Sequence, residues 1–160
     1  MKRFLCVLVV CLLLSGCIMP SDPVLDSLGE PIESGFWTSG GFQDYTDYAK
    51  YRYSNVISEE LARNQYFSQV SEEDIPRIQK VVENFEEWVA EGEISGEEDG
   101  ERLADNYDFS IEMISVGDYF YLDDHGYYDP TDKNYLNFFE YDLYYFAIET
   151  QTLYFFHNNF

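Results

Sequence analysis

The spacing of apolar side chains changes at about Tyr107, and this change limits the folds that the chain can adopt. Before it, the apolar residues from Ile75 to Val89 recur every three or four positions, which predicts an amphipathic helix. After it, residues 109–113 alternate between apolar and polar side chains, which is typical of a half-buried strand. Helices followed by strands indicate an α+β domain, in which helices cover one face of an antiparallel sheet.

Three helices are expected in the first half of the chain. The clearest begins at the capping box of residues 71–74 and ends at Gly92, with a stripe of apolar side chains along one side. A short helix is expected after Ser58, and the spacing of aromatic residues over 42–49 predicts another. We interpret the acidic, glycine-rich residues 91–101 as a solvated loop, because they do not match a calcium-binding EF-hand loop.

Four strands are expected in the second half. They cover residues 109–113, 119–122, 138–148 and 153–157, and the short link 149–152 predicts a hairpin between the last two. The sequence therefore predicts N-terminal helices packed on one face of a C-terminal, mostly antiparallel, four-stranded meander.

The N-terminus has the three parts of an export signal. Lys2 and Arg3 precede an uncharged apolar run of 11 residues, which is too short to span a membrane, and small residues follow it. The stretch Leu14-Ser15-Gly16-Cys17 resembles the lipobox of bacterial lipoproteins. The resemblance implies that Cys17 receives a diacylglyceryl group and becomes the first mature residue after residues 1–16 are removed. Two acyl chains would give stable membrane attachment.

These features predict three segments: a signal peptide at 1–16, a lipidated cysteine with a flexible tether at 17–40, and one globular domain at 41–160. Loss of the signal peptide would remove two basic residues and no acid, so 7 basic and 31 acidic side chains would remain. Such a surface repels nucleic acid. Cys6 and Cys11 would leave with the signal, so a lipidated Cys17 excludes internal disulfides and thiol catalysis.

Aromatic residues are concentrated at the C-terminal end, where 16 of the 42 residues from Tyr119 onward are Phe or Tyr. Because rings fall on both faces of the predicted strands, a single buried face cannot hold them all. We expect one face to be a tyrosine-rich binding surface, since tyrosine gives a large contact area at low entropic cost. The candidate residues are Tyr119, Tyr121, Tyr141, Tyr144 and Tyr154.

No other group of residues predicts chemistry. Carboxylate pairs are abundant in so acidic a chain, and their spacing does not single out a catalytic pair. The oxygen-rich residues Asp123, Asp124, His125, Asp129 and Asp132 could bind a hard cation, but a polar loop with turn signals is favoured. We therefore expect no catalytic residues, no metal and no cofactor.

Several stretches of the chain resemble those of small predicted lipoproteins of Gram-positive bacteria. The resemblance spans most of the mature domain and implies a bacterial cell envelope, but it implies no activity. It is carried by the lipobox and by Gly41-Phe42-Gln43-Asp44-Tyr45-Thr46-Asp47-Tyr48, Asn84-Phe85-Glu86-Glu87-Trp88, Gly117-Asp118-Tyr119-Phe120-Tyr121 and Leu153-Tyr154-Phe155-Phe156-His157-Asn158-Asn159.

The sequence thus predicts a lipoprotein held on the extracytoplasmic face of the cell membrane, with a non-catalytic domain that binds an envelope or secreted protein. A basic partner would suit the acidic surface, and its binding should weaken as salt rises. The alternative is binding to a cell-wall or other glycan, which predicts weak dependence on salt.

Overall fold

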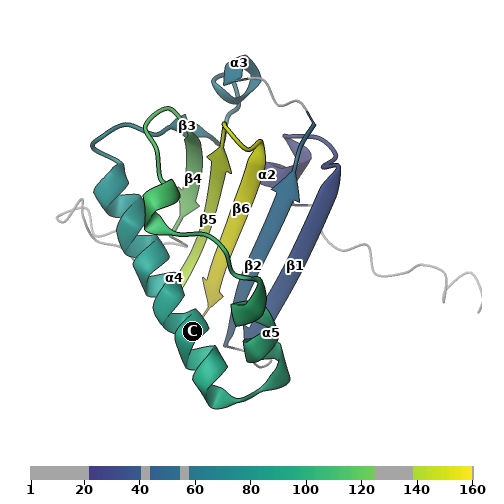
Figure 1. Cartoon of the computed structure of the whole chain (residues 1–160). Helices are drawn as coiled ribbons and strands as arrows, with labels where there is room; N and C mark the ends of the chain where they lie inside the picture. Colours follow the sequence, from purple (N-terminus) through teal and green to yellow (C-terminus); the bar gives the residue numbers. More distant parts are fainter. Residues whose placement is uncertain (1–21, 41–43, 55–57, 125–138, 160) are drawn as a thin grey trace, which may run out of the picture.

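A computed structural model of the chain describes residues 22–40, 44–54, 58–124 and 139–159. Its central element is one antiparallel sheet of six strands in the order β1-β2-β6-β5-β4-β3 (Figure 1). The helices and the antiparallel sheet fit an α+β class, but the predicted four-stranded meander is wrong. The strands are β1 (Glu33–Gly40), β2 (Tyr45–Arg52), β3 (Ser68–Gln69), β4 (Tyr119–Asp123), β5 (Glu140–Ala147) and β6 (Thr152–Asn159).

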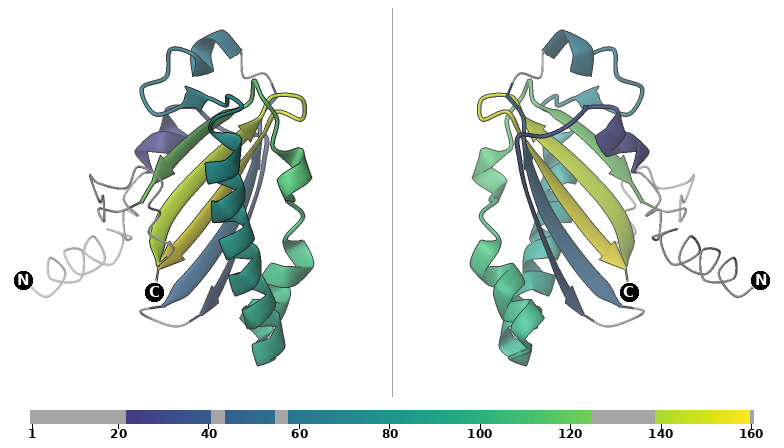
Figure 2. Two further views of the ribbon diagram at one scale, coloured as in Figure 1. Left: turned by 90° about the vertical axis from the view of Figure 1, so that its left-hand side faces the viewer. Right: turned by 90° about the vertical axis from the view of Figure 1, so that its right-hand side faces the viewer.

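Helices pack on both faces of the sheet. The long α4 (Ile75–Ser95), α5 (Glu98–Asn106) and the 3-10 helix η1 (Ile111–Met113) cover one face, which we call the helix side (Figure 2). The short α2 (Pro23–Asp26) lies against the opposite face, and α3 (Ser58–Leu61) lies beyond one end of the strands.

Helix α4 confirms the helix expected after the capping box. The backbone amide and the hydroxyl of Ser71 both donate to Asp74 Oδ2, at 2.9 and 2.6 Å, directly before the helix begins. The helix continues past Gly92 to Ser95 and is capped by Gly96, which has a φ of 69°. Gly92 instead lies against Gly100 of α5, and a β-carbon at position 100 would overlap the backbone of Gly92. The predicted acidic loop is therefore wrong, because this close packing of two helices occupies residues 91–101.

Two further predictions of secondary structure are wrong. Residues 42–49 were expected to be helical, but Tyr45–Arg52 is the strand β2 between β1 and β6. A strand with packing on both faces needs no strict alternation, so Tyr48 and Ala49 are both buried and together imitate a helical spacing. The strand expected at 109–113 is irregular and ends in η1, while the short β3 pairs with β4 at that edge of the sheet.

The aromatic side chains fill two cores, one on each side of the sheet. On the helix side, Tyr48, Leu143 and Phe156 lie in register across three strands beneath Phe85 of α4. On the opposite side, Tyr53, Tyr144 and Phe146 pack with residues of α2 and α3. The Tyr144 hydroxyl donates to Asp22 at 2.8 Å, which ties the start of α2 to β5. Two-sided packing is therefore how one sheet accommodates so many rings.

The chain before residue 41 contributes to this structure. Residues 22–40, which we assigned to the tether, form α2 and the complete edge strand β1. The signal peptide and Cys17 lie outside the described residues, as does the stretch 125–138 of the oxygen-rich loop.

Candidate functional site

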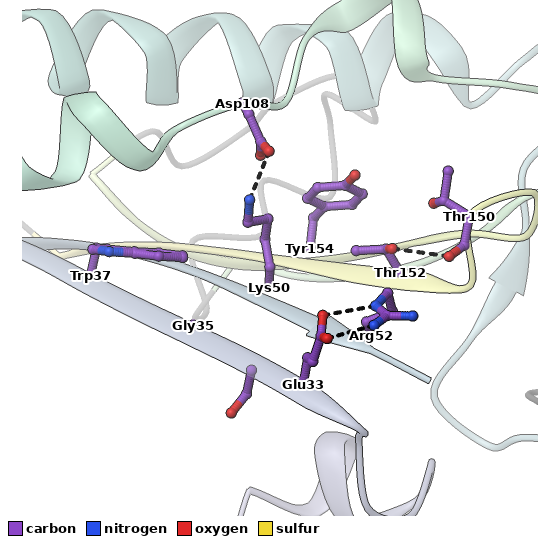
Figure 3. A pocket seen from close by; sticks show the side chains of 10 residues that line it. Glu33, Gly35, Trp37, Lys50, Arg52, Asp108, Thr150, Thr152 and Tyr154 are labelled. Carbon is purple, nitrogen blue, oxygen red and sulfur yellow. Dashed lines mark hydrogen bonds and ion pairs between the residues drawn. The ribbon is translucent and has the colours of Figure 1, made fainter. Parts of the chain in front are cut away.

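A pocket of about 500 Å³ opens on the helix side of the sheet, at the ends of β1, β2 and β6 (Figure 3). Strand β1 contributes Gly35 and Trp37, β2 contributes Lys50 and Arg52, and β6 contributes Tyr154. These side chains share a face because they are two residues apart along each strand and in register between strands. Strand pairing therefore builds most of the pocket.

Trp37 forms a flat wall of the pocket. Its ring lies parallel to the sheet (Figure 3) and directly over Gly35, where a β-carbon would overlap Cη2 and lie 2.8 Å from Cζ2. The ring stacks against Tyr48, with the centroids 5.8 Å apart and the planes inclined by 27°. The Lys50 ammonium lies 5.6 Å from the centroid of the Trp37 ring. The indole is therefore held in place by Gly35, Tyr48 and Lys50, and it remains half-buried.

Lys50 also makes an ion pair with Asp108, on the segment that follows α5. Lys50 Nζ lies 2.7 Å from Asp108 Oδ2, and the Tyr48 hydroxyl donates to the other oxygen at 2.8 Å. This hydrogen bond adds to burial in raising the pKa of Tyr48, so the phenol stays protonated as a donor. Asp108 thus joins the helical layer to the sheet at the pocket wall.

A second ion pair lies at the other end of the pocket. The Arg52 guanidinium contacts Glu33 through two nitrogens, at 2.6 and 2.9 Å. The hydrogen bond and charge of Arg52 hold the pKa of Glu33 below its usual value, so Glu33 stays ionised. Ser34, Thr150, Thr152 and Tyr154 complete the lining, and the Thr152 hydroxyl donates to the Thr150 carbonyl at 3.2 Å.

The pocket is electrically balanced, although the chain has a net charge of −22. Its two cations, Lys50 and Arg52, are matched by Asp108 and Glu33. An aromatic wall, several hydroxyls and paired charges allow a ligand to stack one apolar face and exchange hydrogen bonds along its edge. Because these four charges are paired, the pocket side chains attract neither cations nor anions strongly.

The predicted tyrosine surface is distributed over both cores. Tyr119, Tyr121 and Tyr144 pack on the face opposite the helix side, whereas Tyr141 and Tyr154 pack on the helix side. All are buried except Tyr121, which is half-buried against Tyr66 and Tyr144. Of the five, Tyr154 alone lines the pocket. These rings therefore do not lie together on one exposed surface.

The prediction missed Gly35, Trp37, Lys50 and Arg52. One signal was present, because the aromatic pair at residues 36 and 37 interrupts an otherwise polar run. Its meaning depends on β1, which the proline-rich residues before it obscured. Lys50 and Arg52 come just after the segment predicted to be helical, so the sequence offered no reason to place them beside Trp37.

A polar row crosses the opposite face of the sheet. Asp47, His157 and Asp142 lie in register on β2, β6 and β5, and His157 Nδ1 is 2.6 Å from Asp142 Oδ1. Burial raises the pKa of Asp47, although the Thr38 hydroxyl and the nearby imidazole act in the opposite direction. No group of three His, Cys, Asp or Glu residues in the described parts of the chain could hold a metal ion.

Comparison of the chain with protein-family models, with curated proteins and with solved structures found no match. Within residues 22–40, 44–54, 58–124 and 139–159, no helix is both long and apolar enough to cross a membrane.

Proposed function

We propose that this chain is a bacterial lipoprotein, anchored through Cys17 on the outer face of the cell membrane, whose domain binds a neutral glycan in the Trp37 pocket. The observation that carries the proposal is the Trp37 ring, which lies flat over Gly35 in a charge-balanced pocket. The C–H face of a sugar ring can stack on an indole, and sugar hydroxyls can pair with the hydroxyls and carboxylates around it.

The balance of charge favours a glycan over a basic protein as the ligand of this pocket. A basic ligand would be attracted by unpaired carboxylates, but both pocket acids are held in ion pairs. Binding of a neutral sugar gains little from long-range electrostatics, so it should depend only weakly on salt. The paired Glu33 stays ionised and can accept hydrogen bonds from sugar hydroxyls.

Co-sedimentation with purified cell-wall polysaccharide tests the proposal. The full chain, solubilised in detergent, should be retained equally at low and at high salt. Trp37→Ala should weaken retention about tenfold, because it removes the stacking contact. Phe36→Ala is the matched control, since Phe36 directly precedes Trp37 in β1 and is 57% exposed on the face of the sheet opposite the pocket. Absence of retention, its loss at high salt, or equal effects of the two substitutions would reject the glycan.

Mass spectrometry of the membrane-extracted protein tests the anchor separately. The mature chain should begin at Cys17 and carry two or more acyl chains, and Cys17→Ser should leave the signal peptide uncleaved. An unmodified N-terminus at any other residue would reject the lipoprotein assignment without affecting the pocket.

A further inference from the structure

The two edges of the sheet differ in how open they are to another strand. Strand β3 forms one edge and has two residues, Ser68–Gln69, whereas β1 forms the other with eight residues in unbroken register with β2. Among the described residues, no strand pairs with the outer side of β1. Its outward N–H and C=O groups therefore form a ready template for hydrogen bonding.

Strand β1 also lacks the features that usually protect an edge. Proteins block exposed edges with proline, with charged side chains, especially lysine, or with bulges. From residue 33 to residue 40 there is no proline or lysine, and the single charged residue, Glu33, is held by Arg52. Phe36 adds an apolar side chain that is 57% exposed on the face opposite the helices. An edge of this length and composition favours association with an extended segment.

The charge beside β1 defines the chemistry of that segment. Helix α5 packs over β1 on the helix side (Figure 1), and Gly92 of α4 lies next to Ser39. Residues 91–106 include seven acids, all exposed, and one basic residue, Arg102, which is paired with Asp99. The acids are Glu91, Glu93, Glu97, Glu98, Asp99, Glu101 and Asp105. A strand added to β1 would thus have carboxylates above one face and Phe36 beside the other.

We propose that the outer edge of β1 accepts an extended basic segment of another envelope or secreted protein as a seventh strand. Because side chains of a strand alternate between faces, the segment carries Lys or Arg on the helix side and apolar residues on the Phe36 side. The backbone hydrogen bonds supply affinity, and the carboxylates of residues 91–106 accelerate encounter. This binding does not require a ligand in the Trp37 pocket.

The test uses the full chain in detergent and a peptide of four Lys-Val repeats, which matches the eight residues of β1. We expect binding that weakens as salt rises, with slower hydrogen exchange at the amides of β1. The same peptide with N-methylated central amides keeps its charge but cannot pair, so it should bind about tenfold more weakly or worse. Equal binding of the two peptides, or protection elsewhere than β1, would overturn the proposal.

Two double variants at exposed positions test the contribution of the acidic residues beside β1. Glu98→Gln with Glu101→Gln, on exposed positions of α5, should weaken peptide binding about tenfold at low salt. Glu72→Gln with Glu73→Gln makes the same change in net charge near β3, at the other edge, and should have a smaller effect. Equal effects would show attraction by net charge alone and would overturn the proposal. Protection of β1 in a dimer without peptide would also overturn it, because the edge would then belong to a second copy.

Discussion

The Trp37 ring covers Gly35 so closely that no larger residue fits at position 35 without moving the indole. The two residues are neighbours on one face of β1, and the absence of a side chain on the first lets the second lie flat. The flat position of the Trp37 ring therefore follows from the structure of β1 and does not require a bound ligand.

Gly35→Ala is expected to raise the indole from the sheet. The overlap should lower the free energy of unfolding by about 1 to 3 kcal/mol and weaken glycan retention about tenfold. Trp37 emission, measured in a Trp88→Phe background, should change with the substitution. Phe36→Ala, on the opposite face of the same strand and outside the pocket lining, serves as the control and should leave all three properties nearly unchanged. Unaltered emission in Gly35→Ala would contradict the packing described here.

Two buried tyrosines should respond in opposite ways to loss of the hydroxyl. Tyr53 Oη is buried and makes no hydrogen bond among the described residues, so Tyr53→Phe should raise the free energy of unfolding by about 1 kcal/mol. The Tyr145 hydroxyl donates to Asp118 at 2.6 Å and accepts from the Ser115 amide at 2.8 Å. Tyr145→Phe should therefore lower it by about 2 kcal/mol, as measured by urea denaturation.

Tyr53 should also make the stability of the protein depend on alkaline pH. Burial raises the pKa of Tyr53 to about 12, whereas an unfolded tyrosine ionises near its usual value of 10.0. The folded state thus binds more protons between these values, and its stability should fall as pH rises through that interval. Tyr53→Phe should make this fall shallower. An unchanged slope would show that Tyr53 ionises in the folded protein as it does in the unfolded chain.

Asp47→Asn should stabilise the protein at neutral pH. Burial raises the pKa of Asp47 above 3.8, so keeping it ionised at neutral pH costs folding free energy. As pH falls through the raised value, the wild-type protein takes up a proton and the advantage of the variant should disappear. Thermal unfolding across this range measures the effect, and exposed Glu72→Gln is the control. A destabilised variant at neutral pH would show that the attraction of Asp47 to His157 exceeds the cost of burial.

The sequence alone determined the elements whose signals are local. The capping box and apolar stripe predicted α4, and the short link at 149–152 predicted the hairpin of β5 and β6, since neighbouring residues along the chain define both. The aromatic surplus showed that one buried face could not hold all the rings, but it led us to expect a tyrosine-rich surface, whereas the structure packs the rings into two cores.

Only the tertiary structure determined that residues 33–52 form the strands β1 and β2. Strands β1 and β2 form because β6, more than a hundred residues later in the chain, provides a pairing partner for β2. Their apolar positions follow two-sided burial and therefore imitate a helix or a tether in the sequence. The pocket depends on that pairing, since it brings Trp37, Lys50 and Tyr154 to one face. Asp108 joins them only when α5 packs over β1, and contacts between such distant segments have no signature in a local pattern of residues.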